Sequence, residues 1–353
     1  MGQSPNSKNY TDNPKDHILV QGNADMKDGQ VHPRIWTTEI TKIADKGDLI
    51  LSVRAPVGDI GKTSYDVVIG RGVAAIKGNE FIFQLLKRMK TVGYWTKYST
   101  GSTFESINSL EINNAVINLP KEHEQNKVGK ILSYMDHAIT LHEEKKRQLE
   151  RLKSALLQKM FANKSGYPVV RFEGFSDEWE QCKLGDVAKI TMGQSPNSKN
   201  YTDNPKDHIL VQGNADMKDG QVHPRIWTTE ITKIADKGDL ILSVRAPVGD
   251  IGKTSYDVVI GRGVAAIKGN EFIFQLLKRM KTVGYWTKYS TGSTFESINS
   301  LEIDNAVINL PKEHEQNKVG KILSYMDHAI TLHDQKLNLL KLVKQSLLQN
   351  MFI

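Results

Sequence analysis

The chain has 353 residues and a formal net charge of +7, with 25% charged and 39% hydrophobic residues, a composition typical of a globular protein of two or more domains. No apolar run approaches the roughly 18 residues that a membrane span needs, so we expect a cytoplasmic protein with no membrane partner. The single cysteine, Cys182, excludes an internal disulfide and a cysteine-rich zinc site. The positive charge favours a nucleic-acid partner, although no segment is a dense basic block.

The sequence contains a long internal repeat. Residues 1–142 recur as residues 192–333, and the two copies differ only at Asn113, which is replaced by Asp304. This period is far longer than that of solenoid repeats, so each copy must be a whole domain with a trailing element. A recent gene duplication without functional meaning remains an alternative explanation of the near-identity.

The first part of each copy is predicted to form short strands and turns. Residues 48–78 contain β-rich runs that glycine and proline interrupt. Residues 81–95 begin as a helix, because Phe81, Leu85 and Met89 recur at close to four-residue spacing. We therefore predict a mixed α/β domain over residues 1–118 and a second one over residues 163–309.

The second part of each copy is predicted to be a long helix, over residues 119–162 and 310–353. Apolar positions recur there every seven residues, which is the pattern of a coiled coil. We expect the two helices to pack antiparallel, because a whole domain must intervene between them. The polar positions in the seam are expected to set register rather than to bind a ligand. The predicted seam consists of Val128, Met135, His142, Leu149, Leu156, Val319, Met326, His333, Leu340 and Leu347, with a companion row at Ile131, Ala138, Lys145 and Leu152.

The predicted fold class is therefore α+β, with two mixed domains and two long helices related by a pseudo-twofold axis. No catalytic motif accompanies this fold in the sequence. We find no GxxxxGK[ST] phosphate loop, no GxSxG or HExxH motif, and no Asn/Asp-Pro-Pro-aromatic tetrapeptide. We therefore predict a non-catalytic protein with no metal site.

Two polar stretches and one arginine have the chemistry of a DNA-binding surface. Residues 3–8 form a Gly/Pro-punctuated loop whose amides can bond adenine edges, and residues 93–108 interleave aromatic, lysine and hydroxyl side chains. Polar turns beside core aromatics are the alternative interpretation. The candidate DNA-binding residues are Gln3, Ser4, Asn6, Lys8, Arg71, Lys97, Ser102 and Thr103, with Gln194, Ser195, Asn197, Lys199, Arg262, Lys288, Ser293 and Thr294 in the second copy.

Several phrases, taken in order, resemble the specificity (S) subunit of type I restriction–modification systems. VVRFEGFSDEWEQCKLGDV resembles the opening of a target-recognition domain in that family. GDLILSVRAPVGDIGK, IGRGVAAI and GSTFESINSLEINNAVINLP resemble its middle and end, and YMDHAITLHEEKKRQLERLKSALLQKMF resembles the conserved spacer helix. The resemblance covers essentially the whole chain.

This resemblance implies two target-recognition domains held apart by an antiparallel helix pair, with no catalysis of their own. Each domain would read one half of a bipartite site in double-stranded DNA. The helices would dock two methyltransferase (M) subunits, which carry S-adenosylmethionine, so that no cofactor is expected in this chain. Restriction/translocase (R) subunits would complete the assembly.

The identity of the two copies adds a hypothesis about the target. Two identical recognition domains related by a twofold axis would read the same half-site on opposite strands, so the target would be an interrupted palindrome. The main alternative is a truncated or silent product of a shuffling specificity locus that does not assemble. A standalone nuclease and a coiled-coil scaffold without DNA binding are further alternatives.

A preface distinguishes the two copies. Residues 167–191 lead into the second copy, and the first copy lacks their counterpart. We expect the first domain to be truncated in this way and to be less stable than the second, because each buried side chain that it lacks is worth roughly 1.5–3 kcal/mol.

Overall fold

The computed structural model describes residues 1–98, 106–163, 165–289 and 297–352. The chain divides into two compact units. Unit 1 comprises residues 1–143 and 336–353, and unit 2 comprises residues 144–335. The segment boundaries predicted from the sequence follow the repeat, whereas the units group residues by contact, and those boundaries stay predictions.

Unit 1 contains two five-stranded sheets, with strand orders β1-β5-β2-β9-β6 and β10-β7-β8-β4-β3. Strand β7 of the second sheet is buried along its whole length and pairs antiparallel with both β10 and β8. The strands are β1 (Tyr10–Thr11), β2 (His17–Val20), β3 (Met26–Lys27), β4 (Gln30–Val31), β5 (Trp36–Thr37), β6 (Ile43–Ala44), β7 (Leu49–Ser52), β8 (Ile60–Lys62), β9 (Val67–Ile69) and β10 (Val73–Ile76).

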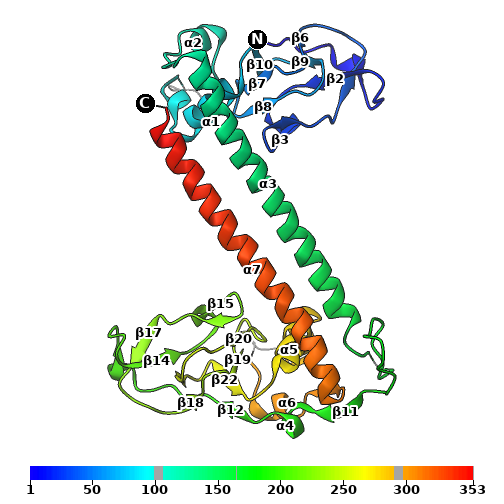
Figure 1. Ribbon diagram of the computed structural model, residues 1–353, viewed down its shortest axis with the longest axis vertical. Coiled ribbons are helices and arrows are strands. Elements are labelled where there is room, and N and C mark those ends of the chain that lie inside the picture. The colour runs from blue at the N-terminus through cyan, green and yellow to red at the C-terminus, as the bar shows by residue number, and fades with distance from the viewer. Residues whose placement is uncertain (99–105, 164, 290–296, 353) are drawn as a thin grey trace. The chain divides into compact units, whose positions relative to one another are not determined.

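Helix α1 (Glu80–Thr91) covers this second sheet and packs against β8 (Figure 1). Asn79 caps it by accepting a hydrogen bond from the amide of Ile82 at 3.1 Å. The helix ends before Gly93, whose φ of +69° suits a residue without a side chain, and a 3₁₀ turn follows over Tyr94–Tyr98. A short helix α2 (Ser109–Asn113) completes the domain.

Unit 2 contains the same domain with additional elements at its start. Its sheets have the orders β13-β17-β14-β21-β18 and β12-β22-β19-β20-β16-β15, and β11 pairs with β23 in a third, two-stranded sheet. The strands are β11 (Glu180–Lys183), β12 (Ile190–Met192), β13 (Tyr201–Thr202), β14 (His208–Val211), β15 (Met217–Lys218), β16 (Gln221–Val222), β17 (Ile226–Thr228), β18 (Ile234–Ala235), β19 (Leu240–Ser243), β20 (Ile251–Lys253), β21 (Val258–Ile260), β22 (Val264–Ile267) and β23 (Val307–Leu310), with helices α4 (Leu184–Val187), α5 (Glu271–Thr282) and α6 (Ser300–Asp304).

Two long helices, α3 (Glu122–Lys159) and α7 (Glu313–Asn350), contribute to both units. Ion pairs inside each unit show that they run antiparallel. In unit 1, Asp136 of α3 pairs with Lys344 of α7, and Glu143 of α3 pairs with Lys341 of α7. Residue numbers therefore rise along α3 in the direction in which they fall along α7. In unit 2 the pairs Lys146–Asp334 and Lys153–Asp327 follow the same direction. The predicted α+β fold class is confirmed.

The row of seam residues predicted on these helices is buried or half-buried in both copies, from Val128 to Leu347. The companion row is wrong, because Ile131 and Leu152 are exposed. The residues that accompany the seam lie one position later, and they include the fully buried Leu132 and the half-buried Lys153. The aliphatic part of a lysine side chain can fill such a position while its amino group reaches a carboxylate. The apolar pattern of the sequence therefore did not identify this row.

Each domain core is completed by the helix that follows the other domain. In unit 1, Phe352 at the end of α7 packs on Phe81 with ring centroids 4.8 Å apart. In unit 2, Phe161 at the end of α3 packs on Phe272 at 5.1 Å. These are equivalent residues in the two copies. The core of each domain therefore depends on both long helices.

The core of unit 2 also buries Trp179, Leu184 and Ala188, which lie in the preface to the second copy. Within the described residues, no side chain of unit 1 takes their places. The lower stability that we expect of the first domain stays a prediction.

The packing of Phe352 in unit 1 and of Phe161 in unit 2 predicts that two matched variants each destabilise one unit. Phe352→Ala removes a buried ring from unit 1 and Phe161→Ala removes its equivalent from unit 2, at about 3–5 kcal/mol each. Hydrogen exchange followed by mass spectrometry should show lost protection at β7 and α1 for the first variant, and at β19 and α5 for the second. Loss of protection in the opposite unit for either variant would contradict the assignment.

Candidate nucleic-acid interface

A polar pocket of about 270 Å³ in unit 2 lies between two exposed arginines, Arg245 and Arg262. Its walls come from the loop at Ser195, the turn at residues 212–214 and the end of β19. The equivalent residues of unit 1 are Ser4, residues 21–23, Arg54 and Arg71, so the surface occurs twice in the chain. We call it the arginine pocket.

The position of Arg262 is fixed through its backbone. Its amide donates a hydrogen bond to the hydroxyl oxygen of Ser195 at 3.0 Å. A Cβ atom on the next residue, Gly263, would lie 1.9 Å from the carbonyl oxygen of Gln212, so no side chain fits there. The chain is therefore held tightly on the inner side, while the guanidinium is left exposed. The amide of Arg71 makes the same bond to Ser4 at 3.1 Å in unit 1.

A buried carboxylate organises the opposite wall. Asp216 accepts hydrogen bonds from the amides of Gln212 at 2.8 Å and Gly213 at 3.3 Å, and its second oxygen lies 3.9 Å from Arg225. In unit 1 the equivalent Asp25 pairs with Arg34 at 3.2 Å. Because backbone amides satisfy the carboxylate, the turn has one defined shape and presents the same polar edge in both units.

Arg54 and Arg245 were missed by the sequence analysis. Each follows a buried strand, and the buried Ser243 fixes the second by donating its hydroxyl to the carbonyl of Arg245 at 3.0 Å. Each also forms an isolated antiparallel bridge, Arg54 to Ser106 and Arg245 to Ser297. The predicted stretch 93–108 therefore returns to the arginine pocket at its end. The signal was an arginine directly after the β-rich run in GDLILSVRAPVGDIGK.

The structure places the predicted loop residues in two groups. Gln3 and Lys8 are exposed, as are Gln194 and Lys199. Asn6 caps a short 3₁₀ turn by accepting a bond from the amide of Lys8, and its own amide binds Glu39 at 2.7 Å. That amide and the side chain of Asn9 lower the pKa of the Glu39 carboxyl. Asn197 makes the same contacts in unit 2. Ser4 and Asn6 thus shape the loop, and contact of these residues with DNA stays a prediction.

Lys97 lies against two tyrosine rings. Its amino group is 3.7 Å from the centroid of Tyr94 and 4.9 Å from that of Tyr98. Desolvation opposes the charge, but hydrogen bonds to both hydroxyls outweigh it and raise the pKa of Lys97. Lys288 has the same surroundings in unit 2. Ser102, Thr103, Ser293 and Thr294 lie outside the described residues.

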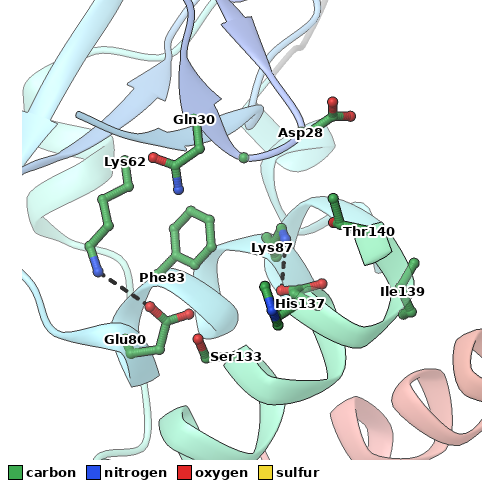
Figure 2. Close-up of a pocket in the computed structure, with 12 residues that line it drawn as sticks. Asp28, Gln30, Lys62, Glu80, Phe83, Lys87, Ser133, His137, Ile139 and Thr140 are labelled. Carbon is green, nitrogen blue, oxygen red and sulfur yellow. Dashed lines mark hydrogen bonds and ion pairs between the residues drawn. The ribbon is translucent and has the colours of Figure 1, made fainter. Parts of the chain in front are cut away.

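A second pocket, of about 530 Å³, lies where the β3–β4 turn, α1 and α3 meet in unit 1 (Figure 2). Lys62 pairs with Glu80 at 3.3 Å, and Lys87 pairs with Asp136 at 3.1 Å. Equivalent residues line a pocket in unit 2. Both lysines of this pocket are thus paired with carboxylates of its wall. Over the part of the chain that the structure describes, no group of three His, Cys, Asp or Glu residues is placed to hold a metal ion.

Asp136 joins three elements at the edge of this pocket. It accepts hydrogen bonds from Gln84 of α1 at 2.8 Å, from Lys87 of α1, and from Lys344 of α7 at 2.5 Å. Burial raises the pKa of Asp136, but these partners outweigh burial and hold the pKa below its ordinary value. Asp327 has the equivalent three partners in unit 2, and its pKa is lowered in the same way. We call these two sites the carboxylate clasps.

A repeated α/β domain with an arginine-bordered pocket, carried on long helices, defines a class of proteins whose surface suits nucleic acid. Residues 1–151 and 176–342 both match the type I restriction modification DNA specificity domain. The chain therefore belongs to the specificity-subunit family of type I restriction–modification systems, with two recognition domains. No helix among the described residues is long and apolar enough to cross a membrane.

Curated relatives agree with this family. The putative type I restriction enzyme MjaX specificity subunit of Methanocaldococcus jannaschii is 30% identical over 240 residues, which cover 64% of this chain and 56% of that protein. The chain thus matches little more than half the length of this relative. The type I restriction enzyme MjaIX specificity subunit of the same organism is 24% identical over 346 residues, covering 87% and 77%.

Solved structures share the fold. The type I restriction–modification S subunit from M. genitalium has a TM-score of 0.69 at 16% identity, covering 100% of this chain and 92% of that one. A chain from a study of complex assembly and conformational transition of the type I R-M system has a TM-score of 0.54 at 23% identity, covering 95% and 91%.

The carboxylate clasps predict an acid-sensitive stability. Because the folded-state pKa values of Asp136 and Asp327 lie below the ordinary 3.8, the stability they supply is present above that pH and is lost as pH falls through the lowered values. Asp327→Asn leaves Lys153 and Lys278 without their carboxylate and should cost about 1–3 kcal/mol. Urea midpoints from about pH 6 downward measure both effects.

The double variant Asp136→Asn/Asp327→Asn should lose less stability on acidification than the unmodified chain. Asp12→Asn is the control, because Asp12 is exposed and lies outside both clasps. An acid loss as steep in the double variant as in the control would show that other groups set the acid limit.

Proposed function

We propose that this chain is the DNA-recognition subunit of a type I restriction–modification complex and that its two domains read the same half-site of a bipartite target. The observation that carries the proposal is the occurrence of the family's specificity domain twice with identical candidate reading residues. Identical surfaces recognise identical base edges. The complex would act on chromosomal DNA in the cytoplasm.

Equivalent residues make the ion pairs between the long helices in the two units. Asp136 binds the lysine that the other helix provides, Lys344, and Asp327 binds Lys153 in the same way. The two units therefore make equivalent contacts with the long helices. Two domains related by the predicted twofold axis would meet the two DNA strands in opposite senses, and the target would be an interrupted palindrome.

The arginine pocket is the part of each domain that we assign to DNA. Exposed guanidinium groups can bind guanine edges bidentately or can bind phosphate, and the polar turn opposite can read an adjacent base. The net charge of +7 is modest for a protein that neutralises many phosphates. We therefore propose that partner subunits supply much of the nonspecific attraction.

Catalysis in this proposal belongs to the partners. Two methyltransferase (M) subunits would dock on α3 and α7 and would carry S-adenosylmethionine. Restriction/translocase (R) subunits would bind the resulting complex. This chain would select the site and position the methyltransferases on it.

A second candidate function is a silent specificity product that does not assemble. The same experiment separates the two possibilities, because only an assembled subunit can direct methylation.

Long-read methylome sequencing of cells that co-express this chain with a cognate M subunit tests the proposed function. We expect new methylation at an interrupted palindrome, because both domains carry the same reading residues. An asymmetric motif would contradict the identical half-sites. No new methylation, with the M subunit shown to be active on another specificity subunit, would favour the silent product.

The arginine pockets predict equal contributions from the two domains. Arg71→Ala and Arg262→Ala should each weaken binding of the M-subunit complex to its site by about 1–3 kcal/mol if the guanidinium reads a base, or lower the salt slope by about one if it binds phosphate. Fluorescence anisotropy over a salt series distinguishes these outcomes. Each variant serves as the control for the other, because the two arginines are equivalent. An effect of Arg262→Ala without an effect of Arg71→Ala would mean that one domain alone reads DNA.

A further inference from the structure

A glutamine lines the arginine pocket in unit 2, and its equivalent occurs in unit 1. Gln212 directly follows β14, and Arg262 follows β21 after one glycine. Because β14 and β21 are parallel neighbours, their carboxyl ends lie at the same edge of the sheet. In unit 1, Gln21 and Arg71 follow the parallel strands β2 and β9 in the same way. The topology therefore brings one glutamine and one arginine to the arginine pocket of each unit.

The backbone of this glutamine is held on two sides. The amide of Gln212 donates a hydrogen bond to the buried carboxylate of Asp216 at 2.8 Å, and the amide of Gln21 donates the same bond to Asp25 at 2.8 Å. The carbonyl oxygen of Gln212 faces Gly263, where a Cβ atom would lie only 1.9 Å away. These contacts are made by backbone atoms of the glutamine, so the shape of the turn does not require its side-chain amide.

The first part of the glutamine side chain is also packed. A Cβ atom on Gly261 would lie 3.2 Å from Cγ of Gln212, and one on Gly70 would lie 3.2 Å from Cγ of Gln21. The glycine therefore leaves the room that the aliphatic part of the glutamine occupies. A side chain that is already packed in this way loses little rotamer freedom when its amide binds a ligand. The packing thus prepares the amide for a specific contact.

The hydrogen-bonding groups of the side-chain amide are largely unused. Gln212 is half-buried, and its Oε1 accepts one hydrogen bond, from the hydroxyl of Tyr201 at 3.4 Å. In unit 1 the equivalent hydroxyl, of Tyr10, donates to the carbonyl of Pro5 instead. Within the part of the chain that the structure describes, no protein group bonds to Nε2 of Gln212 or to the side-chain amide of Gln21. Because an amide oxygen has two lone pairs, a donor and an acceptor are available side by side in both units.

We propose that Gln21 and Gln212 are specificity-determining residues that each read an adenine in the major groove. Nε2 donates to N7 of the base, and Oε1 accepts from its N6 amino group. Guanine presents two acceptors at this edge, N7 and O6, so the amide oxygen would face an oxygen. Each glutamine reads the half-site of its own domain, and this step rests on the proposed function.

The neighbouring arginines favour a role of the glutamine in base reading. A neutral amide forms weaker bonds to phosphate than the charged guanidinium groups of Arg245 and Arg262, which border the same pocket. The paired donor and acceptor of the amide instead match adenine, the one base that presents an acceptor and a donor side by side in the major groove. The arginines can therefore hold phosphate or guanine while the glutamine selects adenine.

Gln212→Ala tests the role of one glutamine while the other is retained. The variant is co-expressed with a cognate M subunit, and the methylated sites are identified by long-read methylome sequencing. We expect one adenine position to be relaxed in one half-site only, so that the interrupted palindrome becomes an asymmetric motif. Sites with another base at that position should be methylated within about twofold of the adenine site, whereas the unmodified chain should discriminate at least about tenfold.

The repeat supplies matched variants. Gln21→Ala should give the same asymmetric motif, read on the opposite strand, and the double variant Gln21→Ala/Gln212→Ala should give a palindrome that is relaxed in both halves. The control is Gln221→Ala, which removes an exposed glutamine of β16 outside the arginine pocket and should leave the motif unchanged.

Gln212→Glu separates base reading from folding. The new side chain has the same length and can pack against Gly261, but its carboxylate only accepts hydrogen bonds. Adenine should be lost from the motif at that position, and cytosine, whose N4 amino group donates, should be favoured instead. Loss of stability cannot produce such a change of the preferred base.

An unchanged motif with Gln212→Ala would overturn the assignment of the glutamines and leave the proposed function intact, as would relaxation at a base other than adenine. Loss of all methylation with both Gln212→Ala and Gln212→Glu would also overturn it, because the side chain would then serve the structure of the pocket. Absence of methylation with the unmodified chain would contradict the proposed function itself, and the assignment with it.

Discussion

The fold of each unit depends on one partly buried carboxylate, Asp136 in unit 1 and Asp327 in unit 2. Each joins the recognition domain, through Gln84 and Lys87 or their equivalents, to the helix that follows that domain and to the helix that follows the other. A carboxylate with two lysine partners is stable only while all three are present, because an unpaired buried charge is costly. The clasp therefore makes the position of the domain on its helices a single, defined one.

The clasps and the aromatic anchors together explain why a repeated domain is useful in this architecture. Each long helix serves its own domain near its start and the other domain at its end, through Phe161 or Phe352. Neither domain core is complete without both helices. Because the exchanged contacts use equivalent residues, one domain sequence can serve both units without separate adaptation of each interface.

The sequence was sufficient to predict the repeat, the mixed domains and the long antiparallel helices, because each has a periodic or repeated signature. It was not sufficient for contacts that polar residues make. Lys153 fills a buried seam position with its stem, so the apolar pattern alone pointed to the exposed Leu152. Arg54 was overlooked because its place beside Arg71 depends on which strand ends meet, and that is a property of sheet topology. The packing of Phe161 and Phe352 into the domain cores could not be predicted either, because it requires contacts between distant parts of the chain.

The same sequence occurs in two different surroundings, so the two units show which structural features the repeat forms by itself and which depend on neighbouring segments. Residues 116–119 become a strand only where another segment pairs with them, as Val307–Leu310 does in unit 2. The arginine pocket behaves differently. The amide of Arg71 donates a hydrogen bond to Ser4 at 3.1 Å, and the amide of Arg262 donates the same bond to Ser195 at 3.0 Å. The two distances agree although, among the described residues, a covering segment is present only in unit 2. The candidate reading surface is thus built from contacts internal to the repeat. Loss or gain of the covering segment would change the stability of a domain and leave the geometry of its arginine pocket the same.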